Sequence, residues 1–183
     1  MRRRLACLVA LLSLTPWCSA SAPAQNEGLE YDVKAAFLLN FTRYVTWPAE
    51  RQKPPFRICV YGSNPFGRRL AQAVSGERWQ NQPMEVRILQ LLSDGRSCHI
   101  LYVPDAAGDV LGDHWTAGAV PTLTVGEDER FLTQGGMIRF FLENNRVRFS
   151  INQTIAESAG LQISSRLLRL ARSVVAPESV RPQ

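Results

Sequence analysis

Short apolar segments alternate with helical patterns through the middle of this chain, and that alternation limits the fold more than any other feature. Strand-like composition predicts β-strands over residues 56–61, 84–89, 98–103 and 122–125. Apolar residues at helical spacing predict helices over residues 29–47, 65–74 and 110–117. Strands that alternate with helices in this way are typical of a largely parallel sheet covered by helices on both faces.

The first predicted helix has its apolar residues on one side. They are Leu29, Val33, Ala36, Phe37, Phe41, Tyr44 and Val45. The dipeptide Trp47-Pro48 ends the pattern, because the residue before a proline is pushed out of the helical region. We therefore expect this helix to pack against the sheet through that apolar side.

The C-terminal third predicts a β-hairpin. Residues 137–142 and 147–151 have strand character, and they flank a turn at 143–146 that contains two asparagines, which tolerate the positive φ of a tight turn. The second strand alternates apolar with polar residues, which predicts one buried face and one wet face. The apolar residues are Val147, Phe149 and Ile151, and the polar ones are Arg148 and Ser150.

Two short helices are expected after the hairpin. One begins near Asn152 and stops at Gly160, a residue type favoured just after a helix. Ser164 and Ser165 can cap the last helix. Its core-facing residues are predicted to be Leu167, Leu168, Leu170, Ala171 and Val174. The chain is thus predicted to be a single α/β domain with a mixed, mostly parallel sheet, helices on both faces, and a C-terminal β-hairpin with helices.

The first 24 residues are typical of a cleaved signal peptide. Arg2, Arg3 and Arg4 precede an apolar run, and small residues follow near residues 19–24. The apolar run has about ten residues, whereas a bilayer span needs about 20. We expect export and cleavage with no remaining membrane anchor, a folded domain over residues 29–176, and a flexible tail over residues 177–183.

The mature chain has a small net charge. The whole sequence carries +5, and removal of the three leader arginines leaves +2, with charges of both signs interspersed. Nucleic-acid binding proteins present a clustered basic stripe instead. The nearest such group, Arg166, Arg169 and Arg172, is more typical of a solvated helix face. We therefore expect no nucleic-acid partner.

Two cysteines remain after removal of the leader. Cys59 and Cys98 each lie in a strand-like segment, and an exported protein meets an oxidising compartment. We predict a disulfide between them, which closes a loop of about 40 residues and stabilises the fold by about 4 kcal/mol in the chain-entropy model. Two buried free thiols are the alternative. A redox-active pair is less favoured, because there is no C-x-x-C spacing.

The sequence offers no constellation for catalysis or metal binding. His99 and His114 have no carboxylates at metal-ligand spacing, and no Gly-x-Ser-x-Gly motif is present. His99 follows Cys98 in a predicted strand, so the two side chains should point to opposite faces. The acidic run at residues 127–129, next to Arg130, is typical of a solvated turn. We predict a protein that is not an enzyme and needs no cofactor or metal.

A glycine-containing loop at residues 62–67 follows a predicted strand and opens a predicted helix. Phosphate-binding loops occupy this position in other folds. This loop, however, lacks the Lys-Ser/Thr of a P-loop and the spacing of a dinucleotide fingerprint. We interpret it as a tight strand-to-helix turn, with Pro65 at a position that helices readily accept.

Several stretches, taken in order, resemble the YfiR family of periplasmic proteins. They are KAAFLLNF (34–41), WP (47–48), ICVYG (58–62), PFG (65–67), CHILYV (98–103), LTV (123–125), GGMIRF (135–140), NRVRFSIN (145–152) and AGLQISSRLL (159–168). The resemblance extends from about Tyr31 to Val174. No single motif is diagnostic, but the ordered set is specific.

The resemblance implies a periplasmic regulator rather than a catalyst. Such a protein binds the periplasmic part of an inner-membrane diguanylate cyclase of the YfiN type and represses it, which controls cyclic-di-GMP and biofilm formation across the membrane. The resemblance also implies a YfiB-type outer-membrane lipoprotein as a second partner, which relieves the repression, and a homodimer. A periplasmic small-ligand binding module without a cyclase partner is the alternative, and it predicts a concave apolar pocket.

The sequence departs from the best-known member of the family in two places. That member has a second cysteine pair where this chain has Thr133 and Phe140, so redox control through that bridge is not expected here. A small-ligand pocket in that member uses basic and imidazole side chains near the stretch that holds Gln162 and Ser164, and this chain has neither type there. The ligand site is therefore not assigned, and the partner-contact residues are also left unassigned.

Overall fold

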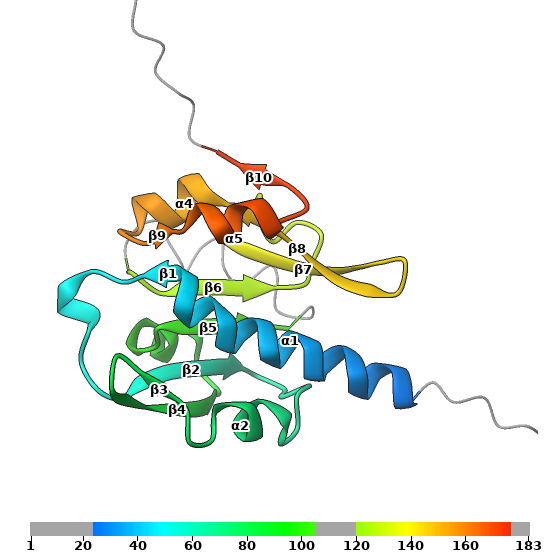
Figure 1. The fold of residues 1–183 in the computed structure, drawn as a ribbon, viewed down its shortest axis with the longest axis horizontal. Helices are drawn as coiled ribbons and strands as arrows, with labels where there is room; N and C mark the ends of the chain where they lie inside the picture. The colour runs from blue at the N-terminus through cyan, green and yellow to red at the C-terminus, as the bar shows by residue number, and fades with distance from the viewer. Residues whose placement is uncertain (1–23, 105–119, 177–183) are drawn as a thin grey trace, which may run out of the picture.

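The computed structural model describes residues 24–104 and 120–176. An eight-stranded sheet forms its centre, with the strand order β10-β8-β7-β6-β5-β2-β4-β3 (Figure 1). Its strands are β2 (Phe56–Tyr61), β3 (Arg78–Trp79), β4 (Gln82–Leu89), β5 (Ile100–Val103), β6 (Leu123–Gly126), β7 (Ile138–Glu143), β8 (Arg146–Asn152) and β10 (Val174–Val175). Two short strands outside it, β1 (Val45–Thr46) and β9 (Gln162–Ile163), pair antiparallel.

Parallel pairing dominates the sheet. Strands β4, β2, β5, β6 and β7 are successive parallel neighbours, and β10 is parallel to β8. The β3–β4 and β7–β8 pairs are antiparallel. The predicted single α/β domain with a mixed, mostly parallel sheet is therefore confirmed.

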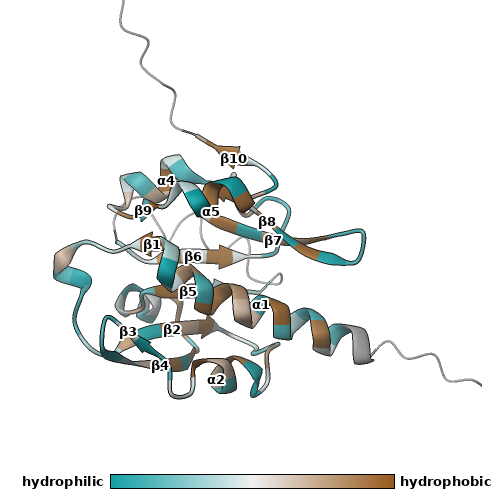
Figure 2. Ribbon diagram, viewed as in Figure 1, coloured by the Kyte–Doolittle hydropathy of each residue, from teal (hydrophilic) through white to brown (hydrophobic). Residues whose placement is uncertain are grey.

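Apolar layers lie on both faces of this sheet. Ile58 and Tyr102 belong to the larger layer, whereas Cys59 and Leu101, their neighbours in sequence, belong to the smaller one. Helices α1 (Ala24–Tyr44) and α2 (Arg69–Val74) cover the larger layer. The 3-10 helix η2 (Leu92–Ser97) covers the smaller one through Leu92. Strands buried on both faces have continuous apolar sequences, as β5 does and as β2 does from Ile58 onward (Figure 2).

The side of α1 that packs on the sheet is only partly the predicted one. Its buried residues include Ala35 and Leu38, which were not predicted, and Phe41, which was, whereas Leu29 is 62% exposed. Val33 and Ala36 are also exposed. The helix ends at Tyr44, earlier than expected, because the next two residues pair with β9. The prediction was right for Phe41 and for Val45, which is buried in β1. It was wrong for the first turns, because this helix has apolar residues on two adjoining sides and only one of them faces the sheet.

The hairpin is confirmed as predicted. Strands β7 and β8 pair from Ile138↔Ile151 to Glu143↔Arg146, and Asn144 and Asn145 have φ values of 50° and 60°. The expected wet face of β8 is only partly wet, since Ser150 is buried. The reason is that the C-terminal segment lies over this strand, where the Ser173 hydroxyl donates to the Ser150 hydroxyl at 2.7 Å.

The two C-terminal helices form, but the last one is shorter than expected. Helix α4 (Gln153–Ser158) is capped by the Asn152 side chain, and α5 (Ser165–Leu170) by the Ser164 hydroxyl. Leu167 is buried as predicted, but Leu170 is 60% exposed. Val174, also exposed, lies in β10 instead of a helix. The prediction failed because Ala171 takes an extended conformation, and the chain then turns to pair with β8.

The glycine-containing loop after β2 has the structure that was predicted for it. The loop at residues 62–67 is a strand-to-helix turn, in which the Asn64 side chain accepts from the Phe66 N–H and donates to the Gly67 carbonyl. The following helix starts at Arg69, later than predicted.

Three predicted segments lie outside the described residues. They are the helix at 110–117, residues 1–23 of the leader, and the tail at 177–183. Among the described helices, none is long and apolar enough to cross a membrane.

Candidate functional site

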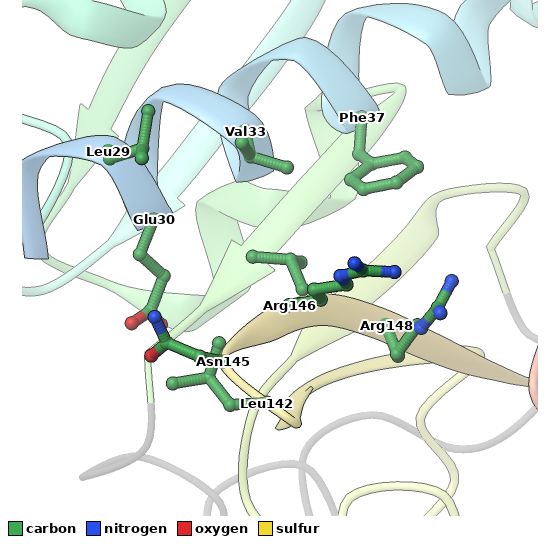
Figure 3. A pocket seen from close by; sticks show the side chains of 9 residues that line it. Leu29, Glu30, Val33, Phe37, Leu142, Asn145, Arg146 and Arg148 are labelled. Carbon is green, nitrogen blue, oxygen red and sulfur yellow. The ribbon is translucent and has the colours of Figure 1, made fainter. Parts of the chain in front are cut away.

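A half-open groove lies between the N-terminal half of α1 and the β7–β8 hairpin. We call it the α1–hairpin groove. In Figure 1 the first turns of α1 and the tip of the hairpin extend to the same side of the molecule. The groove has a volume of about 320 Å³, in the lower range of protein binding sites. Its lining residues are Leu29, Glu30, Val33, Phe37, Leu142, Asn145, Arg146, Val147 and Arg148 (Figure 3).

The helix side of the groove is an apolar stripe. Leu29, Val33 and Phe37 follow one another at every fourth position, so they share one side of α1. Phe37 packs edge-on against Phe149 of β8, with 5.4 Å between ring centres. Leu142 of β7, which is 50% exposed, lies on the opposite wall. Contiguous exposed apolar side chains such as these mark interaction surfaces in soluble proteins.

The strand side of the groove is an uncovered strand edge. The Arg172 N–H donates to the Phe149 carbonyl at 2.8 Å, and the Ile151 N–H donates to the Ser173 carbonyl at 3.0 Å. β10 then pairs with Ile151 and Asn152. Within the described part of the chain, no strand lies beside the first three residues of β8, at positions 146–148.

Arginines surround this edge. Arg148 and Arg172 both pair with Glu143, at 3.7 and 2.8 Å. Arg146 lies opposite Glu143 in the hairpin. Three arginines around one glutamate leave two positive charges at this edge of the hairpin, and Arg146 and Arg148 lie across the gap from α1 (Figure 3). Glu30, on the α1 side of the groove, is paired with Lys34.

A buried ion cluster lies at the base of α1, next to the groove. The Lys34 ammonium is 2.7 Å from a Glu127 oxygen, and it also pairs with Glu30, one helical turn earlier. The Tyr102 hydroxyl donates to the other Glu127 oxygen. Burial by itself lowers the pKa of Lys34, but the hydrogen bonds with Glu127 and Glu30 outweigh it and raise that pKa above its usual value.

The cluster holds α1 against the end of the central strands. Glu127 follows β6, and Tyr102 lies in β5, so the lysine connects the helix to both strands. The Lys34 ammonium also lies 4.4 Å from the centre of the Tyr31 ring. Burial, together with the nearby Glu127 charge, raises the pKa of the Tyr31 hydroxyl. These contacts fix the position of the helix that supplies one wall of the groove.

The expectation of a solvated acidic run was wrong for Glu127. Its side chain is 14% exposed and bound to Lys34. Glu129 is exposed, and Asp128 accepts from the Arg130 N–H in the turn, as expected of a surface loop. Sequence inspection missed the cluster because Lys34 was not recognised as part of the buried side of α1. The signal available in the sequence was position: Lys34 lies next to Ala35 and one helical turn before Leu38, so it belongs to the same side of the helix as these two buried residues.

The scan against protein-family models matches this chain to the YfiR/HmsC-like family over residues 31–172. The chain belongs to the YfiR/HmsC-like family. Membership implies a periplasmic regulator of cyclic-di-GMP signalling, and the family is regulatory, not catalytic. No curated protein matches the sequence.

One solved structure shows the same fold. It is a conserved domain protein from Vibrio cholerae, which aligns with a TM-score of 0.53 and 11% sequence identity. The alignment covers 79% of this chain and 60% of the Vibrio chain, so the present chain spans less than two thirds of that protein. At this identity the likeness establishes the fold alone.

The stretch GGMIRF, which carries part of the likeness to the YfiR/HmsC-like family, has a packing role here. The Phe131 ring is fully buried between Gly126 and Gly136. A Cβ atom placed on Gly136 would lie 2.2 Å from the Phe131 ring, and one on Gly126 would lie 2.4 Å from it. Both glycines are required because the aromatic ring lies directly against their backbones.

The predicted cysteine pair lies on the face of the sheet opposite α1. Cys59 and Cys98 form a disulfide, with 6.0 Å between their Cα atoms, and both are fully buried in the smaller apolar layer. Thr133 and Phe140 are the residues that the resemblance places where the best-known family member has its second cysteine pair. Phe140 is buried and stacks on Phe41, while the Thr133 hydroxyl donates to the Arg130 carbonyl.

His99 points away from Cys98, as expected, into an aromatic cluster formed with Trp47, Phe56 and Trp79. The Arg57 N–H donates to His99 Nδ1 at 3.0 Å, so the ring is neutral and its Nε2–H donates to the Arg51 carbonyl at 2.7 Å. Burial lowers the pKa of His99. Across residues 24–104 and 120–176, no three His, Cys, Asp or Glu side chains lie close enough to hold a metal ion.

Proposed function

We propose that this chain is a periplasmic regulatory protein that binds the periplasmic part of a YfiN-type inner-membrane diguanylate cyclase and represses it. The observation that carries the proposal is the match to the YfiR/HmsC-like family over residues 31–172. The α1–hairpin groove supports it, because its exposed apolar stripe is suited to contact another protein. Binding on the outer side of the inner membrane then controls cyclic-di-GMP, and so biofilm formation, on the inner side.

The proposal requires export. The leader of residues 1–24 delivers the domain to the periplasm, where the partner domain of the cyclase lies. A chain that lacks the leader but folds in the cytoplasm cannot reach that partner. A protein with this function must therefore be exported, whereas a protein that acts in the cytoplasm need not be.

The test compares cyclic-di-GMP in four strains that express the cyclase: the wild type, a deletion of this chain, the deletion complemented with the full sequence, and the deletion complemented without residues 1–24. We expect raised nucleotide in the deletion, restoration by the full sequence, and no restoration by the leaderless form. Deletion of the cyclase as well should remove the rise. Equal nucleotide levels in the wild type and the deletion would refute repression.

We further propose that a YfiB-type outer-membrane lipoprotein relieves the repression by binding this chain, and that the chain forms a homodimer. Co-purification from membranes tests the first, and sedimentation equilibrium of the mature protein tests the second. A mass equal to one chain at all concentrations would refute the dimer.

A further inference from the structure

We propose that the α1–hairpin groove binds an extended acidic segment of a partner polypeptide, which adds to the free edge of β8 as a further strand. Acidic and apolar residues alternate along that segment. The proposal deepens the proposed function by naming the binding surface, and it rests on that function only for the identity of the partner. It follows from the backbone of β8 and from the side chains on its two faces.

The backbone of β8 is arranged to accept a strand at residues 146–148. In an antiparallel pair, opposite residues alternate between those that bond to each other and those whose N–H and C=O point outward. Phe149 and Ile151 use their outward groups to bind the C-terminal segment. Val147 follows in the same alternation, and its side of the strand lies along the groove. The chain's own C-terminal segment thus shows that this edge pairs with an added strand.

The side chains near the edge specify the sequence of the added strand. Neighbours across a strand pair share a face, and successive residues alternate between faces. A residue opposite Val147 therefore lies on the α1 face, beside Val33 and Leu142, and should be apolar. The residues on either side of it lie on the face of Arg146 and Arg148, where the net charge is positive, and should be acidic. The expected pattern is acidic, apolar, acidic.

A second copy of this chain fits this edge poorly. If two β8 edges paired across a two-fold axis at Val147, Arg146 of each copy would lie opposite Arg148 of the other. Like charges directly opposite one another destabilise a strand pair. The same positive charges attract an acidic segment, so charge complementarity selects a different polypeptide.

The test uses three acetylated and amidated peptides, EVEVE, EEVVE and KVKVK, with the mature protein purified from the periplasm. Isothermal titration calorimetry measures affinity, and amide hydrogen exchange measures protection at Val147. We expect EVEVE to bind and to protect the Val147 N–H. EEVVE has the same composition without the alternation, so we expect it to bind about tenfold or more weakly, a difference of at least about 1.4 kcal/mol. KVKVK should not bind.

A charge exchange makes the test independent of a single peptide. In Arg146→Glu/Arg148→Glu, KVKVK should bind and EVEVE should lose at least about tenfold in affinity. Failure of EVEVE to bind the wild-type protein overturns the proposal, and so does equal binding of EVEVE and EEVVE. If this double variant does not fold, the comparison of the three peptides on the wild-type protein decides alone.

Two further readouts separate other occupants of the groove. Dodecanoate is an acidic amphiphile without a peptide backbone, and its binding in the groove without binding of EVEVE would overturn the proposal in favour of a small-ligand site. If Leu29→Asp disrupts a dimer of this chain and EVEVE does not bind the wild-type protein, the groove would be a self-association surface and the proposal would be overturned. None of these measurements contains the cyclase. If EVEVE binds the purified protein but deletion of this chain does not raise cyclic-di-GMP in cells, the proposed function is refuted and the assignment of the groove remains.

Discussion

Lys34 and Glu127, which are far apart in sequence, meet as a buried ion pair with 2.7 Å between their charged atoms, and the lysine side chain is 1% exposed. A lysine this deeply buried is uncommon unless it is paired. Here the pair joins α1 to the end of β6. It therefore determines where one wall of the α1–hairpin groove lies.

Replacement of Lys34 by methionine should lower the free energy of unfolding by about 3 kcal/mol, because it leaves the Glu127 carboxylate without its partner. Chemical denaturation measures the change. Arg43→Met is the matched control, since Arg43 is 63% exposed in its pair with Glu77 and should cost no more than about 0.5 kcal/mol. The double variant Lys34→Met/Glu127→Gln should recover part of the loss. Equal effects in the two single variants would contradict a structural role for the buried pair.

The stability of the protein should decrease as the pH falls below the usual pKa of histidine, 6.5. Burial holds the pKa of His99 below that value in the folded state, so the unfolded state binds more protons at mildly acidic pH. This contribution is fully present above pH 6.5 and is lost as the pH falls toward the lowered pKa. Urea unfolding at several pH values should give a steeper fall for the wild type than for His99→Gln. Parallel curves would show that this histidine does not titrate as described.

Mature protein from the periplasm should contain no thiol that reacts after denaturation without a reductant, because Cys59 and Cys98 are joined. The variant Cys59→Ala/Cys98→Ala should lose about 2–4 kcal/mol of stability, mainly through greater freedom of the unfolded chain. Thiol titration and denaturation measure the two effects. Two reactive thiols per chain in unreduced protein would rule out the bridge.

Gly136→Ala should destabilise the fold by about 1–3 kcal/mol, since the new methyl group would overlap the buried Phe131 ring. Gly76→Ala is the control. Gly76, unlike Gly136, has a positive φ, and it has open space where a Cβ would be, so its cost should be limited to backbone strain of about 1 kcal/mol. Combination of Gly136→Ala with Phe131→Leu should cost less than the sum of the single changes. Strict additivity would show that the Phe131 ring is not the source of the cost and would leave the Phe131 carbonyl oxygen, 2.6 Å from the same Cβ position, as the clashing atom.

Leu29→Asp should relieve repression and raise cyclic-di-GMP in cells, because it places a charge in the apolar stripe of the groove. A charge in a contact surface should weaken binding about tenfold or more. Leu91→Asp is a matched control, since Leu91 is 63% exposed and Leu29 is 62% exposed, but Leu91 lies after β4 and away from the groove. Similar amounts of both variants in the periplasm must be confirmed by immunoblot. Equal nucleotide levels in the two strains would remove the groove from the partner interface.

Much of the fold was predictable from local patterns. The apolar composition of β2 and β5 reflects burial on both faces, and the two asparagines at the hairpin tip adopt the positive φ values that such a turn requires. The candidate site was much less predictable. Leu29 and Val33 were expected in the core but are exposed. Glu127 was expected in solvent but is largely buried against Lys34.

The sequence by itself determined the order of the central strands β2, β4, β5 and β6, the hairpin, and the two cysteines available for a bridge, because each depends on neighbouring residues or on composition. Tertiary structure alone decided which side of α1 is covered. A helix with apolar residues on two sides has no local signal for the side that meets the sheet. Only the assembled sheet brings Glu127 to Lys34 and leaves Leu29 and Val33 facing the free edge of β8. The groove is therefore a product of packing between distant segments.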